Sequence, residues 1–268
     1  MDPVQGKIVV VTGGASGIGA ASAVELAAQG WRVVVADINI AQARVVAAGI
    51  EGEAIELDVS DDDSVKHAAL DVEQRIGPVF GLVNSAGIIQ KPVSPHELDM
   101  ELWDRIQRIN FRGSYISSLA FGRGMLSREA GSIVNISSIT GSVSTPLHSY
   151  GPSKAAVVSM TQCLAAEWGP AQVRVNSIAP GYTLTPALLG AIERGERKLE
   201  SLQANAALQR AVQPSQIGVA VAFLLSDGAA AITGVDLPVD CGWLVANPWH
   251  TYGGMRKVPV AAHAAKPR

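Results

Sequence analysis

A tyrosine and a lysine lie four positions apart in Tyr150-Gly-Pro-Ser-Lys154, at the start of a predicted helix. Residues at this spacing share one helix face. A free phenol has a pKa of about 10, and a neighbouring positive charge favours its phenolate form. Lowering that pKa to about 7 takes about 4 kcal/mol, which a lysine in a low-dielectric cleft would supply with the help of a cationic ring bound nearby. The pair therefore predicts a tyrosine base tuned by an ammonium group, although a half-buried tyrosine beside a solvated lysine has the same spacing.

A glycine-rich turn follows the first predicted strand, Lys7–Thr12. The turn reads Thr12-Gly-Gly-Ala-Ser-Gly-Ile-Gly19 and leads into a helix predicted over Gly17–Gln29. Its glycines allow a tight turn and close approach of the backbone to a ligand. The helix N-terminus suits a pyrophosphate. The spacing differs from the Gly-x-Gly-x-x-Gly fingerprint, but its position between strand and helix indicates a nucleotide site.

Asp37 ends the second predicted strand, Arg32–Asp37. A carboxylate there accepts hydrogen bonds from the adenosine ribose hydroxyls. Its charge would repel a 2′-phosphate, so the sequence favours NAD over NADP. A simple turn aspartate is the alternative. Neither Arg32 nor Arg44 directly follows the strand end, so we predict no phosphate clamp.

Predicted strands and helices alternate along the chain. Ser60 is expected to cap a helix whose first turn is acidic, Asp61 to Asp63. The alternation predicts a single-domain α/β fold with a doubly wound parallel sheet of seven strands. Beyond those already given, the expected strands are Glu53–Leu57, Phe80–Asn84, Ser132–Ile136, Val173–Ile178 and Leu237–Val239, and the expected helices are Leu98–Arg128, His148–Trp168 and Pro214–Leu225.

Composition excludes several classes of protein. The 268 residues are 48% apolar and 17% charged, as in one large globular domain. A net charge of −3 argues against a nucleic-acid partner. The two cysteines, Cys163 and Cys241, fit a reduced cytoplasmic protein. We expect no signal peptide, and no apolar run approaches the roughly 20 residues of a membrane span.

Further motifs in order are Asp58-Val59, Asn84-Ser-Ala-Gly87, Asn110, Ser137-Ser138 and Pro180-Gly181. With the turn and the Tyr/Lys pair, they make the chain resemble the short-chain dehydrogenase/reductase family from about Gly6 to Trp243. The resemblance implies a Rossmann fold and hydride transfer between an alcohol and a ketone. The cofactor contacts that it implies are Gly13, Ser16, Gly17, Ile18, Gly19, Asp37, Asp58, Val59, Asn84, Ala86, Gly87, Tyr150, Lys154, Pro180, Gly181, Thr183 and Thr185.

The resemblance also implies catalytic roles, none of which needs a metal. Tyr150 would exchange the alcohol proton, and Lys154 would lower its pKa and bind the nicotinamide ribose. Ser138 would hold the substrate oxygen, with Ser137 as the rival assignment. Asn110 would bend its helix and hold a water that links Lys154 to solvent.

Two departures from the family pattern concern neighbouring parts of this site. Ser85 stands where the family often has a second asparagine, which leaves the strand-holding contacts there in question. The interval from Ser138 to Tyr150 is one residue shorter than is usual, which predicts an unusual loop.

Two regions fall outside the strand–helix alternation. Leu184–Arg210 is charged and has no strand pattern, as in a mobile substrate lid or a solvated helix pair. We assign residues 1–246 to the domain and 247–268 to a C-terminal extension whose Trp249, Tyr252 and Met255 are apolar. The resemblance implies a homotetramer, to whose interface Met160, Leu164 and Trp168 would contribute unless they lie in the core.

Polar residues near the predicted site favour a substrate with several hydroxyls. These are Gln90, Ser142, His148 and His250. The stretches at 83–88 and 120–126 are similar to polyol dehydrogenases of the family, so we expect a polyol or sugar substrate and NAD. The alternatives are a ketoacyl-thioester or steroid-type reductase and, in another class, a non-catalytic nucleotide-sensing protein.

Overall fold

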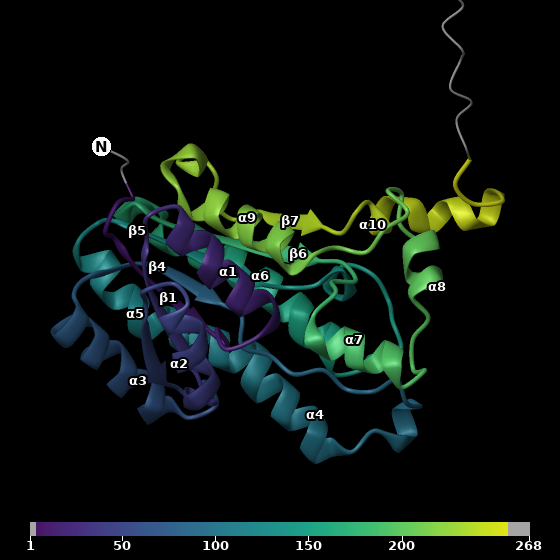
Figure 1. The fold of residues 1–268 in the computed structure, drawn as a ribbon, viewed down its shortest axis with the longest axis horizontal. Coiled ribbons are helices and arrows are strands. Elements are labelled where there is room, and N and C mark those ends of the chain that lie inside the picture. Colours follow the sequence, from purple (N-terminus) through teal and green to yellow (C-terminus); the bar gives the residue numbers. More distant parts are fainter. Residues whose placement is uncertain (1–3, 257–268) are drawn as a thin grey trace, which may run out of the picture.

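The computed structural model describes residues 4–256, whose centre is a parallel sheet with the strand order β3-β2-β1-β4-β5-β6-β7. Helices cover both faces of the sheet (Figure 1). This confirms the doubly wound seven-stranded fold predicted from the sequence. The strands are β1 (Ile8–Thr12), β2 (Arg32–Asp37), β3 (Glu53–Glu56), β4 (Val79–Asn84), β5 (Gly131–Ile136), β6 (Val173–Pro180) and β7 (Asp236–Val239).

The helices alternate with these strands as expected. The predicted helix over Leu98–Arg128 is a helical run in which a π-helical segment, Gln107–Gly113, separates two α-helices. The α-helices are α1 (Gly17–Ala28), α2 (Ile40–Ala48), α3 (Asp62–Asp71), α4 (Met100–Ile106), α5 (Ser114–Ser127), α6 (Tyr150–Trp168), α7 (Pro186–Glu193), α8 (Leu199–Ala204), α9 (Pro214–Leu225) and α10 (Trp243–Ala246).

The sheet separates two apolar cores. Successive side chains of a strand point to opposite faces. On β1, Val10 therefore joins the core under α5 and α6, whereas Val9 and Val11 join the core under α1 and α9. All three are fully buried. Because both faces are covered, the strand is apolar throughout, which is the pattern its sequence showed.

The predicted N-cap at Ser60 is wrong. Asp61 caps α3 instead, since its carboxylate accepts hydrogen bonds from the amides of Asp63 (2.9 Å) and Ser64 (3.3 Å). Ser60 is turned the other way, and its amide (2.8 Å) and hydroxyl (2.7 Å) donate to Asp58. Because Ser60 bonds Asp58 in the turn after β3, its hydroxyl does not cap α3.

The segment Leu184–Arg210 contains the two short helices α7 and α8. Figure 1 shows α8 and α10 at the end of the sheet toward which the β7 arrow points. The carboxyl ends of parallel strands are where ligands bind in such folds. An ion pair between Lys91 and Glu196 (2.8 Å) joins the segment to the loop after β4.

Large apolar residues of α6 and of the tail differ in their surroundings. Met160, Leu164 and Trp168 are buried in the core of this chain, which settles the alternative left open for them. Trp249 and Tyr252 belong to a 3₁₀ segment, Asn247–Tyr252, and are exposed. Met255 is partly buried, and residues 257–268 of the predicted extension lie outside the described residues. Within residues 4–256, no helix has the length and apolar character that crossing a membrane requires.

Candidate active site

Lys154 lies one turn beyond Tyr150 on α6. Its side-chain nitrogen lies 5.6 Å from the centroid of the Tyr150 ring and donates a hydrogen bond to the Ile136 carbonyl at 2.7 Å. Burial lowers the pKa of Lys154 to about 8. The ammonium is thus still charged at neutral pH, and the end of β5 fixes its position.

The pKa of Tyr150 moves in the direction opposite to the one expected from the Tyr/Lys spacing. Burial raises it, and a hydrogen bond with Ser138 lowers it by a smaller amount. The expected lowering included a cationic ring bound nearby. In the protein alone, loss of hydration disfavours the phenolate, so Tyr150 favours the neutral phenol.

Ser138, rather than Ser137, faces the phenol. The Ser138 hydroxyl lowers the pKa of the Tyr150 phenol, and it accepts hydrogen bonds from the amide (3.2 Å) and hydroxyl (3.0 Å) of Thr140. The Ser137 hydroxyl instead bonds the Ile178 carbonyl (2.8 Å) and the Asp236 carboxylate (2.7 Å). Ser137 thus joins β5 to β6 and β7, which leaves Ser138 as the serine of the site.

Asn110 lies in the π-helical segment, where the helix departs from α geometry. Its side-chain oxygen accepts from the Ile88 amide at 2.8 Å. Its side-chain nitrogen donates to the Ile88 carbonyl (2.9 Å) and the Ser153 hydroxyl (3.2 Å). A Cβ added at Gly87 would lie 3.2 Å from the Asn110 oxygen and 3.7 Å from the Lys154 nitrogen. The loop after β4 therefore lies directly over both residues.

The glycine-rich turn has the shape of an anion-binding site. Gly13 and Gly17 have φ of +65° and +54°, and a Cβ at Gly19 would collide with the Gly13 carbonyl. Ser16 is the N-cap of α1 and makes no side-chain capping hydrogen bond, and Ile18 lies in the first turn. The first amides of this 12-residue helix thus remain available to a pyrophosphate.

Asp37 fixes this turn while keeping capacity for a ligand. One of its oxygens accepts from the Ala15 amide (3.0 Å) and the other from the Asn39 amide (2.9 Å). An ionised carboxylate has about four acceptor sites. Asp37 can therefore act as a turn residue and still accept hydrogen bonds from ribose hydroxyls.

Asp58 and Val59 lie on the adenine side of the expected cofactor site. Asp58 and Ile38 both line a cleft of about 650 Å³. Val59 is buried in the core, and its side chain packs against Gly113. Any contact between Val59 and an adenine ring would thus involve its backbone.

Asn84 belongs to a buried polar network, of which the sequence motifs contain only one member. Its side-chain nitrogen donates to the Asn135 oxygen (2.8 Å) and to the Ser118 hydroxyl (2.9 Å). Asn135 in turn donates to the Thr161 hydroxyl at 2.9 Å. Asn84 and Asn135 are register partners on β4 and β5. An asparagine in each of two neighbouring apolar strands is the signal that could have identified this network.

Thr12 makes the strand-holding contact at Ser85, where the family often has a second asparagine. Its hydroxyl accepts hydrogen bonds from the amides of Ser85 (3.3 Å) and Ala86 (3.4 Å). The last residue of β1 thus holds the turn after β4. The missing second asparagine is therefore compensated by the hydroxyl of Thr12 and by the Asn84 network.

The segment after β6 closes the other side of the turn. Pro180 ends β6, and a Cβ at Gly181 would lie 2.7 Å from the Asp240 Cα. Thr183 is buried and forms an isolated bridge with Val212. Thr185 caps α7, and its methyl group would lie 3.4 Å from a Cβ at Gly17. The start of α7 therefore lies beside the glycine-rich turn.

The comparisons with known proteins agree with this geometry. A family model described as enoyl-(acyl carrier protein) reductase matches residues 13–244. D-threitol dehydrogenase of Mycolicibacterium smegmatis is 38% identical over 246 residues, covering 90% of this chain and 94% of that protein. Galactitol 2-dehydrogenase (L-tagatose-forming) of Cereibacter sphaeroides is also 38% identical, with 90% and 96% covered. The chain belongs to the short-chain dehydrogenase/reductase family.

A solved structure titled ribose-5-phosphate isomerase from Brucella melitensis 16M is 48% identical, with a TM-score of 0.94 and coverage of 96% of this chain and 99% of that chain. The structure titled gox2181 is 33% identical, with a TM-score of 0.87 and coverage of 90% and 96%. This short-chain dehydrogenase/reductase is an oxidoreductase, and its family uses a nicotinamide cofactor.

The polar residues expected to bind substrate hydroxyls do not gather in one place in this short-chain dehydrogenase/reductase. Gln90 is only 4% exposed, and its side-chain oxygen accepts from the amides of Ser149 and Tyr150. That oxygen is therefore already engaged, so a hydroxyl contact of Gln90 would use its side-chain nitrogen, which has no hydrogen-bond partner among the described residues. Ser142 and His148 are exposed on the loop before α6, whereas His250 lies in the C-terminal 3₁₀ segment.

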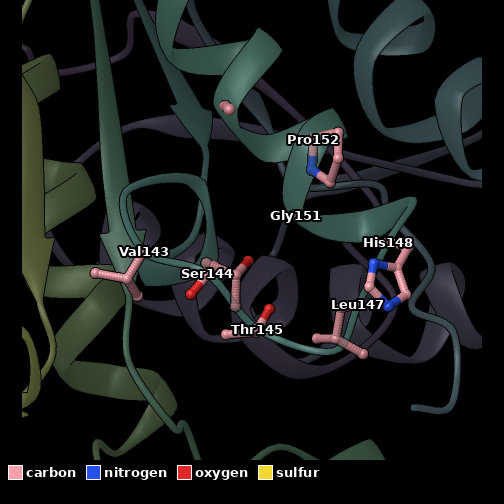
Figure 2. Close-up of a pocket in the computed structure, with 9 residues that line it drawn as sticks. Val143, Ser144, Thr145, Leu147, His148, Gly151 and Pro152 are labelled. Carbon is pink, nitrogen blue, oxygen red and sulfur yellow. The ribbon is translucent and has the colours of Figure 1, made fainter. Parts of the chain in front are cut away.

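His148 lines a hollow of about 320 Å³ together with Ser144 and Thr145. Figure 2 shows the loop that carries Val143 to Leu147 across from the first turn of α6. Gly151 also lines the hollow. One helical residue step is about 100°, so Gly151 lies about a quarter turn around α6 from Tyr150. Thr140, which contacts Ser138, also lines the hollow, so the hollow adjoins the candidate site.

Proposed function

We propose that this protein is an NAD-dependent dehydrogenase that interconverts a secondary alcohol of a polyol or sugar and the corresponding ketone. One observation carries the reaction class. The Ser138 hydroxyl faces the Tyr150 phenol and lowers its pKa, while Lys154 is fixed one turn further along the same helix face. This arrangement places a proton donor and acceptor, an oxygen-binding hydroxyl and a positive charge together.

The side chains have separate roles in the oxidation. Bound NAD would supply the hydride acceptor and a positively charged nicotinamide ring. Ser138 donates a hydrogen bond to the substrate oxygen and stabilises its developing negative charge. Tyr150 accepts the alcohol proton at its phenolic oxygen and returns it in the reverse direction. Lys154 stabilises the phenolate and binds the nicotinamide ribose, and Asn110 holds the route by which the proton leaves.

The cofactor preference rests on Asp37. Its carboxylate faces the glycine-rich turn and would oppose a 2′-phosphate. The next residue, Ile38, is 64% exposed and brings no positive charge to the strand end. Ser16 to Gly19 would hold the pyrophosphate, and the segment from Gly181 to Thr185 would hold the carboxamide. These features support NAD over NADP.

The substrate class is supported by relatives named for D-threitol and galactitol that align over nearly their whole length. The description of the matching family model favours a second candidate, a reductase of acyl thioesters. A panel of polyols, aldoses, ketoacyl thioesters and enoyl thioesters, each with NAD(H) and NADP(H), is read at the nicotinamide absorbance. We expect polyol oxidation with NAD. Turnover of thioesters alone with NADPH would reject both the substrate and the cofactor.

We also propose that residues 1–246 form the domain, that Leu184–Arg210 acts as a substrate lid, and that the protein is a homotetramer. Tyr115 and Leu119 on α5 are 42% and 43% exposed, which supports an interface on the helix that continues from Asn110. Light scattering on the purified protein measures the mass directly. A monomer at micromolar concentration would reject the tetramer.

A further inference from the structure

The first amides of α6 are hydrogen-bonded by a side chain from another part of the chain. A helix N-terminus leaves amide groups without partners inside the helix. Ser149, the N-cap of α6, makes no side-chain capping hydrogen bond. Instead, the side-chain oxygen of Gln90 accepts from the amides of Ser149 (2.7 Å) and Tyr150 (3.1 Å). Because both neighbours are donors, the oxygen of the Gln90 amide must face them.

Gln90 comes from a loop that is itself fixed. Two residues earlier, both backbone polar groups of Ile88 bond the Asn110 side chain. Gln90 is only 4% exposed. Its side-chain nitrogen has no hydrogen-bond partner among the described residues. All the hydrogen bonding of this buried amide group is therefore directed at the start of α6.

Ser149 is also held from the opposite side. Gln107 donates to its carbonyl at 2.9 Å, and the Ser149 hydroxyl donates to the Trp103 carbonyl at 3.0 Å. These contacts end at Ser149. Only the Gln90 contact, among those of the described residues around this turn, reaches the backbone amide of Tyr150 from another segment. Gln90 thus fixes the position of the Tyr150 backbone at the first residue of α6.

We propose that Gln90 is a positioning residue for Tyr150. By capping the start of α6, Gln90 holds the phenol against Ser138. The inference rests on the proposed function, in which Tyr150 exchanges the proton. Displacements of about 1 Å can cost about 100-fold in rate when the reacting groups depend on precise placement. Loss of the cap should therefore reduce kcat more than it changes substrate or cofactor binding.

Two substitutions test the hydrogen bonds of Gln90 and the effect of an added charge separately. Gln90→Met has similar length but cannot accept the two hydrogen bonds, and we expect kcat to fall about tenfold while KM for both substrates stays within about twofold. Gln90→Glu keeps an oxygen for both amides and adds a negative charge beside Tyr150, which favours the protonated phenol. At high pH, kcat of Gln90→Glu should reach the wild-type value. The midpoint of the rise of kcat with pH should lie about half a pH unit above that of the wild type.

A matched control exists at another helix. The side-chain oxygen of Gln216 accepts from the Gln213 amide (3.0 Å) at the start of α9 and from Arg210 (2.9 Å). Gln216→Met and Gln216→Glu make the same chemical changes there. We expect them to leave kcat and its pH profile unchanged. Thermal unfolding of all four variants shows whether any rate loss follows from a loss of folded protein.

The outcomes distinguish this proposal from the proposed function. Wild-type kcat in Gln90→Met, or an unshifted profile in Gln90→Glu, overturns the role of Gln90. If Gln90→Met does not fold, Gln90→Glu decides alone. If the wild-type protein oxidises no polyol, the proposed function fails, and Gln90 is then tested by the ultraviolet phenolate titration of Tyr150 with NAD present, taken as the difference from Tyr150→Phe. Gln90→Glu should raise that midpoint, and an unchanged midpoint would reject the inference.

Discussion

The side-chain nitrogen of Lys154 lies 5.6 Å from the centroid of the Tyr150 ring and is tied by a 2.7 Å hydrogen bond to the Ile136 carbonyl at the end of β5. The lysine therefore acts on the phenol through its charge, from a position set by the sheet. In the protein alone this charge does not offset burial, since the pKa of Tyr150 is raised. In the proposed reaction, the oxidised cofactor would add the positive charge that favours the Tyr150 phenolate.

Tyr150→Phe should abolish turnover and spare cofactor binding. General acid–base groups contribute about 10²–10⁴-fold to rate, so we expect kcat to fall by about 10³. The glycine-rich turn and Asp37 remain intact, so the Kd for NAD, measured by tryptophan fluorescence, should stay within about twofold. A variant that keeps more than a few percent of the wild-type rate would show that another group transfers the proton.

Ser138→Ala and Ser137→Ala should have opposite effects. Ser138→Ala removes the hydroxyl that faces Tyr150, and loss of one oxyanion donor costs about 10²–10³ in kcat. Ser137→Ala removes bonds to Ile178 and Asp236 between strands. It should lower the free energy of unfolding by about 1–3 kcal/mol and leave kcat nearly unchanged. Steady-state kinetics and chemical denaturation of both variants check this, and exchanged phenotypes would reverse the assignment.

The affinity for NAD should fall as the pH rises through about 8. Burial lowers the pKa of Lys154 to about 8, so the ammonium is charged below that pH and neutral above it. A charged donor bonds the ribose oxygens more strongly than a neutral amine. Titrations of NAD from pH 6 to pH 10 measure the change. Lys154→Met should bind weakly and without this pH dependence, and the same slope in both proteins would assign the titration to another group.

The sequence predicted those parts of the site that depend on neighbouring residues. The strand, the glycine-rich turn and the Tyr150/Lys154 spacing are local patterns, and each lies where it was expected. The hydrogen bonds of Gln90 and the pairing of Asn84 with Asn135 join segments that are 51 to 60 positions apart. An asparagine in each of two apolar strands is a sequence signal for the second contact, whereas spacing along the chain contains no information on the Gln90 contacts or on the desolvation that raises the pKa of Tyr150.

Asp37→Asn should weaken the preference for NAD over NADP. The substitution keeps the size of the side chain and removes the charge that opposes a 2′-phosphate. We expect the ratio of kcat/KM values for the two cofactors to fall by about tenfold, which corresponds to about 1.4 kcal/mol. Asp61→Asn, at the cap of α3, removes a nearby charge as a control and should leave the ratio unchanged. A wild-type enzyme that already prefers NADP would contradict the role of Asp37.

Lys91→Met should weaken closure of the proposed lid over the substrate. The ion pair of Lys91 with Glu196 joins the loop after β4 to the segment between α7 and α8. Both groups are partly solvated, so the effect should be modest, with KM for the polyol raised about two- to threefold and kcat nearly unchanged. Added salt should raise the KM of the wild type toward that of the variant, because salt screens exposed pairs.

Arg194→Met is the matched control for this pair. Arg194 also bonds Glu196, at 3.1 Å, but from the same segment, so its loss leaves the connection between Lys91 and Glu196 intact. The pKa of Glu196 is lowered to about 2, chiefly by its hydrogen bond from Arg194, and the carboxylate therefore stays charged at every pH above that value. The effect of Lys91→Met on KM should thus be the same at pH 6 and pH 8. Equal changes of KM in Lys91→Met and Arg194→Met would show that the ion pair between the two segments does not determine KM for the polyol.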